Sequence, residues 1–576
     1  MKAVPVLLKH LMKARSKFHE RGRDESFDGK LEKLRLELSQ IKKVFVRVKK
    51  NEEELLDRLA EVDGHLRKLD RKSLYQDTDA ICERISDCVH KLLPKDDVDD
   101  SSEEEGHKRS EIQRSSRPSS EKHKNQLLLP KQLHTDLHIL EVHEQHCLFS
   151  LLVFPEGAII KKKHTIYWWI GEGLLKYSED KTAEEEGEDV MDKLFQSNVI
   201  VPYGNGKCPI VNKFQINPVF RPGLLLRLRE KYHSSYAVDV RTYYSPLRGT
   251  WLVLEQQKVI VGNGDSLNTR RWIDTIFNVG ASYLNFGSNW LDKNMYNLKV
   301  LQLGRWQDSP SHHIEVGSEE FLKKLLNQKD LTYISLRGIS RISKLPPSIA
   351  QLESLQILDL KACHNLETLP NDISSMKSLT HLILSQCYLL ESMPKGIQKL
   401  TQLQVLKGFL KGNPRKTPYT VSDLATLKNL RQLSIHLGSE VVIKDGEFES
   451  LGELPALEHL KISWGVSDTR YSDIKMIFPS SLKKLHLEGF RGQKIPEWLK
   501  PSKMPKGCQE LKIVGGELRS MNYDEDKYLW GMEIVHLKYL KHLKVDIAKL
   551  TGLFPFLKYA EIKQISNHSY LEWSIV

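Results

Sequence analysis

Residues 355–384 read LQILDLKACHNLETLPNDISSMKSLTHLIL, and the last six residues repeat the outline of the first six. The shared pattern is L-x-x-L-x-L, and successive copies start at 331, 355, 379 and 403, although the copy at 403 ends in Gly408. The starts are 24 residues apart, and weaker copies extend the series from Leu298 to Val545. A fixed period of this length is typical of a stacked repeat array, in which neighbouring units bury a shared hydrophobic core.

Each copy predicts one strand of a parallel sheet in a leucine-rich-repeat horseshoe of α/β type, with the leucines pointing into the core. Cys363 and Cys387 occupy the turn after the strand in the two clearest copies, so we interpret them as packing residues. Strand residues that point away from the core form the concave face, where such arrays bind partners. The candidate partner-binding residues are Gln356, Asp359, Thr380, Ile383, Gln404, Lys461 and Lys484.

The first 95 residues predict a helical domain. Between Leu34 and Leu69 the apolar residues alternate at spacings of four and three, which places them on one seam of a helical hairpin or coiled coil. An α-helical bundle folded on itself and an intermolecular coil both fit this pattern. The seam residues that would meet a partner helix, or fill the core of the bundle, are Leu55, Leu59, Val62 and Leu66.

Residues 96–126 are acidic and serine-rich with few apolar side chains, which predicts a disordered linker. Residues 127–232 are again rich in apolar side chains and predict three helices, followed by a hairpin between 199–201 and 210–211 around Asn205-Gly206. Three helices and a hairpin are the layout of a winged helix. We expect a junction over 233–295 and leucine-rich repeats over 296–576.

The winged-helix segment carries a family resemblance. Its residues Cys147-Leu148-Phe149, Phe154-Pro155-Glu156, Trp168 to Gly173 and Ala183 to Leu194 resemble the winged helix of plant coiled-coil nucleotide-binding leucine-rich-repeat (NLR) disease-resistance proteins. The order of helical domain, winged helix and repeats is also similar to the order in that family. The resemblance implies a plant defence protein that recognises a protein ligand, either a pathogen effector or a host protein, and works with a full-length NLR. Self-association through the helical domain is a further expectation.

The nucleotide-binding module of that family has no counterpart in this sequence. Those receptors carry the module between the helical domain and the winged helix, where this sequence has only the acidic linker. The phosphate-loop pattern G-x-x-x-x-G-K-[ST] does not occur in the sequence. The family's Met-His-Asp signature aligns with Ile216-Asn217-Pro218, which retains neither the His nor the Asp. The sequence therefore predicts a truncated member with no nucleotide switch and no cofactor.

Catalytic and metal-binding patterns are not found. The sequence contains no G-x-S-x-G elbow, paired-cysteine motif or H-R-D loop, so we do not expect an enzyme. A cluster of possible ligands includes His134, His138, His143, His146 and Cys147, but no second pair completes a tetrahedral site at the usual spacing. We therefore expect no metal and interpret these histidines as structural or solvated.

Lys161-Lys162-Lys163 beside the winged helix favours an alternative function, a nucleic-acid-associated regulator that contacts phosphates with these lysines. The net charge of +11 also fits nucleic acid, an anionic membrane or an acidic protein partner. In the resembling family this domain is a packing element, so protein recognition in defence is the preferred hypothesis, and nucleic acid and membrane binding are not expected.

Seven cysteines without a C-x-x-C pair are typical of reduced thiols, and the apolar stretch near the start is too short for a signal or a membrane span. We therefore expect a cytoplasmic protein, with a nuclear location as the alternative.

Overall fold

The computed structural model describes residues 31 and 34 and most of residues 140–575. The positions left out of the latter range are 176–180, 205–207, 232–234, 237–240, 245–249, 262–272, 288–289, 292–297, 308–313, 413–418, 439–440, 466–473, 524–527, 544–546 and 566–569. The predicted linker, the seam residues Leu55, Leu59, Val62 and Leu66, and nearly all of the predicted helical domain lie outside the described residues.

The repeats form a 16-stranded sheet in the described part of the chain. Within the run from β6 to β22 all neighbouring strands are parallel to each other. At the two ends, β4 pairs antiparallel with β5, β5 with β6, and β23 with β22. The strands are β4 Ser235–Tyr236, β5 Arg241–Tyr244, β6 Thr250–Leu254, β8 Ile273–Asn278, β10 Val300–Gln302, β12 Tyr333–Ser335, β14 Ile357–Asp359, β15 His381–Ile383, β16 Val405–Lys411, β17 Gln432–Leu437, β18 His459–Trp464, β19 Lys484–Phe490, β20 Glu510–Gly516, β21 Ile534–Lys538, β22 Tyr559–Ile565 and β23 Tyr570–Ile575.

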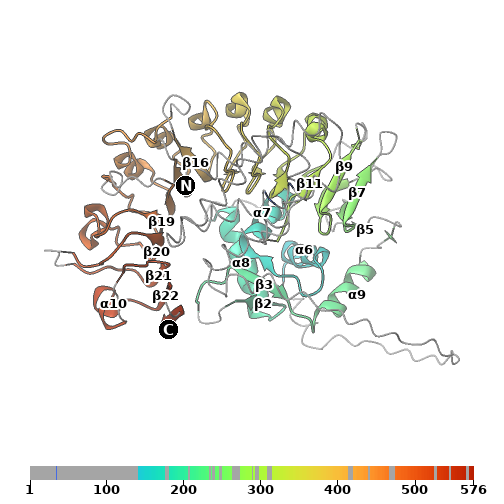
Figure 1. The fold of residues 1–576 in the computed structure, drawn as a ribbon. Helices are drawn as coiled ribbons and strands as arrows, with labels where there is room; N and C mark the ends of the chain where they lie inside the picture. Colours follow the sequence, from blue (N-terminus) through green and yellow to red (C-terminus); the bar gives the residue numbers. More distant parts are fainter. Residues whose placement is uncertain are drawn as a thin grey trace.

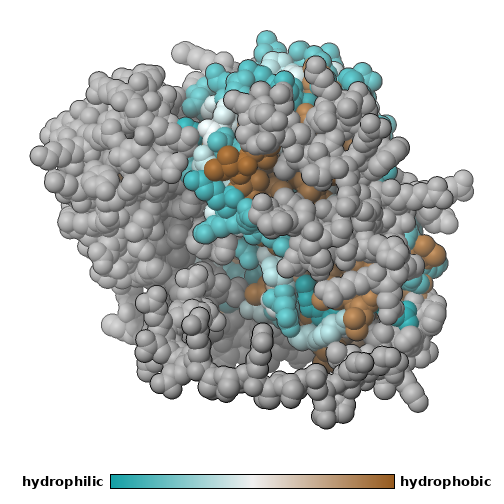
Figure 2. Space-filling model, turned by 90° about the vertical axis from the view of Figure 1, so that its right-hand side faces the viewer, coloured by the Kyte–Doolittle hydropathy of each residue, from teal (hydrophilic) through white to brown (hydrophobic). Residues whose placement is uncertain are grey.

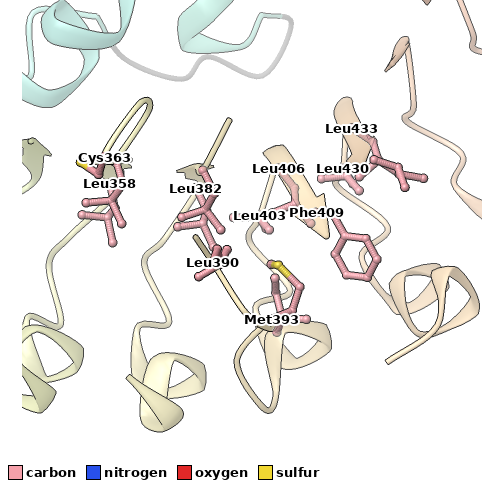
Figure 3. Close-up of a cluster of buried hydrophobic side chains, with 14 of the residues drawn as sticks. Leu358, Cys363, Leu382, Leu390, Met393, Leu403, Leu406, Phe409, Leu430 and Leu433 are labelled. Atoms are coloured by element: carbon pink, nitrogen blue, oxygen red, sulfur yellow. The ribbon is translucent and has the colours of Figure 1, made fainter. Parts of the chain in front are cut away.

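The register of the sheet confirms the predicted repeat. The fourth residue of each pattern pairs with its counterpart in the next copy, as Ile334 with Leu358, Leu358 with Leu382, and Leu382 with Leu406. These side chains are at most 1% exposed, and Figure 3 shows Leu358, Leu382 and Leu406 stacked along the core. The array is therefore held together by neighbour-to-neighbour burial of identical positions.

The turn after the strand also repeats. Gly338, Ala362 and Gln386 stand 24 residues apart and all have a positive φ, between 61° and 69°. In the two later copies a cysteine follows: Cys363 Sγ donates to the Leu336 carbonyl at 3.0 Å, and Cys387 Sγ donates to the Leu360 carbonyl at 3.1 Å. The structure thus confirms that both cysteines are packing residues.

Short helices and a second sheet form the convex side. The second sheet is parallel and comprises β7 Lys258–Val261, β9 Tyr283–Phe286, β11 Ile314–Val316 and β13 Ile339–Ser340. The helices that follow along the chain are η3 Glu319–Asn327, η4 Pro347–Gln351, η5 Asn371–Ser375, η6 Ile397–Lys399, η7 Val421–Thr426, η8 Glu449–Glu453, η10 Glu497–Leu499, η11 Pro501–Lys503 and α10 Ile547–Leu553.

The start of the repeats and the placement of one repeat copy differ from the prediction. The expected junction over 233–295 contains β4 to β9, so the repeat architecture begins earlier than residue 296. The sequence pattern missed these units because β6 and β8 do not belong to the series of copies spaced 24 residues apart. Their core positions are filled by residues such as Ile276. The copy placed at Leu540/Leu543/Val545 is also wrong: the strand is β21, and Leu540 and Leu543 are buried in the turn after it.

The winged helix is present as predicted, with an added strand. Its helices are α6 Val142–Ser150, η2 Leu151–Val153, α7 Lys162–Glu172, α8 Ala183–Gln196 and α9 Arg221–Lys231. Its antiparallel sheet has the order β1-β3-β2, with β1 Ile160–Lys161, β2 Ile200–Tyr203 and β3 Lys213–Ile216. The last strand begins at 213 and not 210, because Phe214 and Ile216 are the residues that face the core. The Asn205-Gly206 turn lies outside the described residues.

Local signals fix the ends of the two central helices. Thr182 caps α8, accepting a hydrogen bond from the Glu185 backbone N–H while the Glu185 side chain accepts from the Thr182 backbone N–H. Gly173 ends α7 with a φ of 79°, a conformation that favours glycine. Figure 1 shows the winged helix, in cyan and green, inside the arc formed by the repeats.

The first units of the array are closed by the antiparallel β4 and β5. Figure 2 views the molecule from this end and shows hydrophobic patches among mainly hydrophilic described residues. Large exposed hydrophobic residues in this part of the chain include Val219, Leu226 of α9 and Ile260 of β7. Ile260 belongs to an end unit of the array, which lacks one neighbour, so an exposed apolar side chain is expected there, whereas Val219 and Leu226 belong to the winged-helix part of the chain.

Candidate functional site on the concave face

The winged helix covers the first part of the concave face. One hydrophobic cluster joins α7 residues to concave residues of the repeats, among them Tyr333, Ile357 and Ile383. The Trp168 ring lies 4.7 Å from the Phe277 ring and 6.0 Å from the Trp251 ring, centroid to centroid. The expectation that at least one residue of the Trp168-Trp169 pair is core is confirmed, since both are at most 2% exposed.

Glu172, the last residue of α7, anchors this interface. Its carboxylate accepts hydrogen bonds from Trp168 Nε1 at 3.1 Å, from Trp251 Nε1 at 2.7 Å and from Thr275 Oγ1 at 2.8 Å. Burial raises the pKa of Glu172 above its ordinary value, although these three donors act in the opposite direction. A single carboxylate thus links the winged helix to β6 and β8.

Close backbone approach continues the interface. Thr332 Oγ1 donates to the Gly171 carbonyl, and a Cβ on Gly171 would lie only 2.4 Å from Tyr333 Cβ. A side chain at position 171 would therefore push α7 away from β12. The Gly-Glu-Gly stretch that resembles the family's winged helix is, in this fold, a contact with the repeats.

The acidic helix α8 binds the next strands. Glu184 accepts from His381 Nε2 at 3.1 Å and from Gln432 Nε2 at 2.9 Å, and Glu185 pairs with Arg431 at 2.7 Å. Burial alone would raise the pKa of Glu184, but the His381 hydrogen bond and the Lys163 charge hold that pKa well below its ordinary value. The Arg431 hydrogen bond lowers the pKa of Glu185 to about 2.

Three buried histidines of this face, His381, His459 and His486, have lowered pKa values and are neutral at pH 7. Burial lowers the pKa of His381, although its hydrogen bond to Glu184 opposes this shift. Burial, and then the charges of nearby lysines, lower the pKa of His459 and of His486 to about 2. A neutral His381 donates Nε2–H to the Glu184 carboxylate without bringing a second charge into the interface.

We expect acid to destabilise the repeats and, through His381, their contact with the winged helix. Below the ordinary histidine pKa of about 6.5 the unfolded chain takes up protons that the folded chain excludes, so stability falls as the pH falls. Each depressed imidazole contributes at most about 1.4 kcal/mol per pH unit. Glu185 adds a further loss between about pH 4.5 and 2, whereas Glu172, with its raised pKa, acts in the opposite direction.

Thermal unfolding measured from pH 7.5 to pH 5 tests this expectation. His381→Gln keeps a donor towards Glu184 but cannot titrate, so the pH dependence of its melting temperature should be shallower than that of the wild type. A wild-type melting temperature that is constant over this range, or an unchanged slope in His381→Gln, contradicts the assignment.

The basic residues beside the winged helix are engaged within the chain. Lys162 Nζ lies 2.5 Å from a Glu188 oxygen and 3.4 Å from an Asp192 oxygen. Lys163 Nζ donates to Gln432 Oε1 at 2.5 Å, and a Glu184 oxygen lies 3.9 Å away. The third helix, which would face DNA in a DNA-binding winged helix, begins with three glutamates and faces the repeats.

The seven concave candidates differ in burial and in position. Asp359 and Ile383 are 5% and 4% exposed, and Ile383 belongs to the cluster shared with the winged helix. Gln356, Thr380 and Gln404 lie one residue before their strands and are half-buried. Lys461 and Lys484 are also half-buried, with 36% and 38% of their side chains exposed, but they lie on β18 and β19, further along the array.

Sequence reasoning missed the continuation of the lysine-bearing face. Lys512, Lys538 and Lys563 lie on β20, β21 and β22, on the same face as Lys461 and Lys484. Lys512 stands between Leu511 and Ile513 of a recognised copy, so the pattern could have identified it. Lys538 and Lys563 had no such signal, because β21 was placed in the wrong register and β22 was not recognised.

The comparisons with known proteins agree with this architecture. A family model described as "Leucine-rich repeat region" matches residues 291–525, and one described as "Disease resistance protein Winged helix domain" matches residues 153–217. Disease resistance RPP13-like protein 4 of Arabidopsis thaliana is 26% identical over 427 residues, which are 73% of this chain and 48% of that protein. The chain is thus similar to plant NLR-type disease-resistance proteins.

A second relative is the probable disease resistance RPP8-like protein 2 of Arabidopsis thaliana, 23% identical over 52% of this chain and 30% of the relative. The chain thus spans about half, or less, of the length of these relatives. A leucine-rich-repeat protein of Leptospira interrogans is 18% identical with a TM-score of 0.33, covering 50% of this chain and 77% of that one.

The described residues contain no group of three metal-binding side chains, and His143 lies near Glu141 and Glu186, at 3.3 and 3.4 Å. His134 and His138 lie outside the described residues. No described helix combines the length and the apolar character needed to cross a membrane.

Proposed function

We propose that this chain is a plant defence recognition protein that binds a protein partner on the concave residues of β18–β22. The observation that carries the proposal is the division of the concave face. The described contacts of the winged helix run from Trp251 of β6 to Gln432 at the start of β17. Beyond them lie half-exposed polar residues such as Lys461 and Lys484, on the face that repeat arrays use for binding.

We further propose that the chain has no nucleotide switch of its own. The sequence contains no phosphate loop. At the position aligned with the family's nucleotide sensor, Asn217 Nδ2 donates to the Asn198 carbonyl at 2.9 Å, and Asn217 Oδ1 accepts from the Val219 N–H at 3.1 Å. These contacts assign Asn217 a role in shaping the turn after the wing, which supports the proposal.

Coupling to a full-length NLR or another signalling partner, through the helical domain of residues 1–95, remains part of the proposal and rests on the sequence alone. A cytoplasmic location is also proposed. The described cysteines, Cys147, Cys208, Cys363, Cys387 and Cys508, are free thiols, which supports a reducing compartment.

The nucleic-acid alternative receives less support. A phosphate binder needs basic side chains available to solvent, whereas Lys162 and Lys163 are paired within the chain. Helix α8 adds Glu184, Glu185 and Glu186 in its first turn, and these acids would repel a phosphate backbone. We therefore keep protein recognition as the function.

Affinity capture from infected and uninfected leaf tissue tests the proposed function. A partner should be retained by the wild type and lost from a Lys461→Glu/Lys484→Glu variant, because charge reversal on the face opposes the contact. The matched control is Lys399→Glu/Lys428→Glu, which reverses two exposed lysines outside the concave sheet. Added ADP or ATP should leave capture unchanged. Equal capture by both variants, or nucleotide-dependent capture, contradicts the proposal.

A further inference from the structure

The concave residues of β18–β22 form rows of basic side chains across neighbouring strands. In the central row Lys461 pairs in register with His486, His486 with Lys512, and Lys512 with His536. Neighbouring strands lie about 4.8 Å apart, so these four side chains are close neighbours. The row ends at Glu561, which accepts from His536 at 2.8 Å in its Nδ1-protonated tautomer.

Carboxylates balance this face only in part. Glu488 pairs with Lys461 at 2.5 Å, Glu510 with Lys484 at 3.1 Å, and Glu561 with Lys538 at 2.7 Å. The face therefore has three carboxylates, on Glu488, Glu510 and Glu561, against the five lysines Lys461, Lys484, Lys512, Lys538 and Lys563.

Burial and crowding of positive charge lower pKa values in the central row. Burial lowers the pKa of Lys512, and the charges of Lys538 and Lys461 lower it further. Burial followed by the charges of Lys461 and Lys512 lowers the pKa of His486 to about 2. The uncomplexed face thus holds basic groups in mutual repulsion, which an added negative charge would relieve.

The chain itself shows how this concave surface accepts carboxylates. Helix α8 presents Glu184 to His381 of β15 and Gln432 of β17. His381 and Gln432 both align with Val405, in a register row that continues to His459 and then Lys484. The row that receives the acidic helix at β15–β17 therefore runs on into the basic part of the face.

We propose that β18–β22 bind a carboxylate-rich segment of a protein partner, seated beside α8 on the same rows. This inference rests on the proposed function and specifies the chemistry of the partner. Glu488, Glu510 and Glu561 lie among the lysines of the face and divide the positive charge into separate positions. Each of these positions can accept an individual carboxylate of the partner. A nucleic acid backbone presents evenly spaced phosphates, which would meet these three glutamates.

Fluorescence anisotropy with labelled decaglutamate and the full chain tests the inference. We expect saturable binding that weakens as salt is raised, and no binding of labelled decaglutamine. Lys461→Gln/Lys512→Gln should weaken decaglutamate binding on the order of tenfold or more, because two cations of the central row are removed. The control Lys399→Gln/Lys428→Gln removes the same charge outside the concave sheet and should change affinity by less than about twofold.

Three results would overturn the inference. They are no binding of decaglutamate by the wild type, equal weakening by both double variants with unchanged melting curves, and a decathymidylate affinity equal to that of decaglutamate. Failure of the inference is distinguishable from failure of the proposed function. If leaf-tissue capture still depends on Lys461 and Lys484 while decaglutamate does not bind, the face recognises a partner of different chemistry.

Discussion

Leu358→Asp is expected to abolish the cooperative unfolding of the repeat array. Leu358 is 1% exposed and lies between Ile334 and Leu382 in the core of the stack (Figure 3). An unpaired buried charge and the lost apolar contact together cost on the order of 5 kcal/mol. Because each repeat is stabilised by its two neighbours, the damage should spread to the adjacent units.

Calorimetry and circular dichroism would measure this effect. Gln356→Asp is the matched control: it introduces the same charge two residues earlier, at a half-buried position before β14. The control should retain a cooperative transition within about 1 kcal/mol of the wild type. Equal melting curves for the two variants would show that the repeat register is wrong.

The repeat core could be predicted because its physical cause is local. A strand that buries every second residue, repeated at a fixed spacing, leaves a leucine pattern in the sequence. The same reasoning failed where the spacing is irregular, as at β6, β8 and β21. At 540–545 the pattern was matched by Leu540 and Leu543, which are buried but lie in the turn that follows β21 and not in the strand itself.

The division of the concave face could not be predicted, because it depends on contacts between distant residues. Glu172 and Thr275 are 103 positions apart, and Arg431 and Glu185 are 246 apart. In the sequence, Asp359 and Ile383 resemble any other concave residue. Their burial depends on the position of α7 within the arc, which the aromatic contacts of Trp168 and the hydrogen bonds of Glu172 stabilise.

Glu172→Ala is expected to release the winged helix from the first repeats. The substitution leaves three buried donors, on Trp168, Trp251 and Thr275, without their acceptor. Each buried donor without a partner costs about 1–3 kcal/mol, so the loss from the three donors should be about 3–9 kcal/mol. Glu172→Gln retains one carbonyl oxygen but turns an amide N–H towards one donor, so its effect should be intermediate.

Hydrogen exchange separates loss of this contact from global unfolding. In Glu172→Ala, exchange should accelerate in α7, β6 and β8, while β18–β20 keep wild-type protection, because the later repeats are stabilised by their own neighbours. Glu188→Ala is the control: it removes a half-exposed carboxylate that pairs with Lys162 from the neighbouring helix, and should cost less than about 1 kcal/mol. Wild-type exchange of β6 and β8 in Glu172→Ala would mean that the aromatic contacts alone hold the winged helix in the arc, with no measurable contribution from the carboxylate.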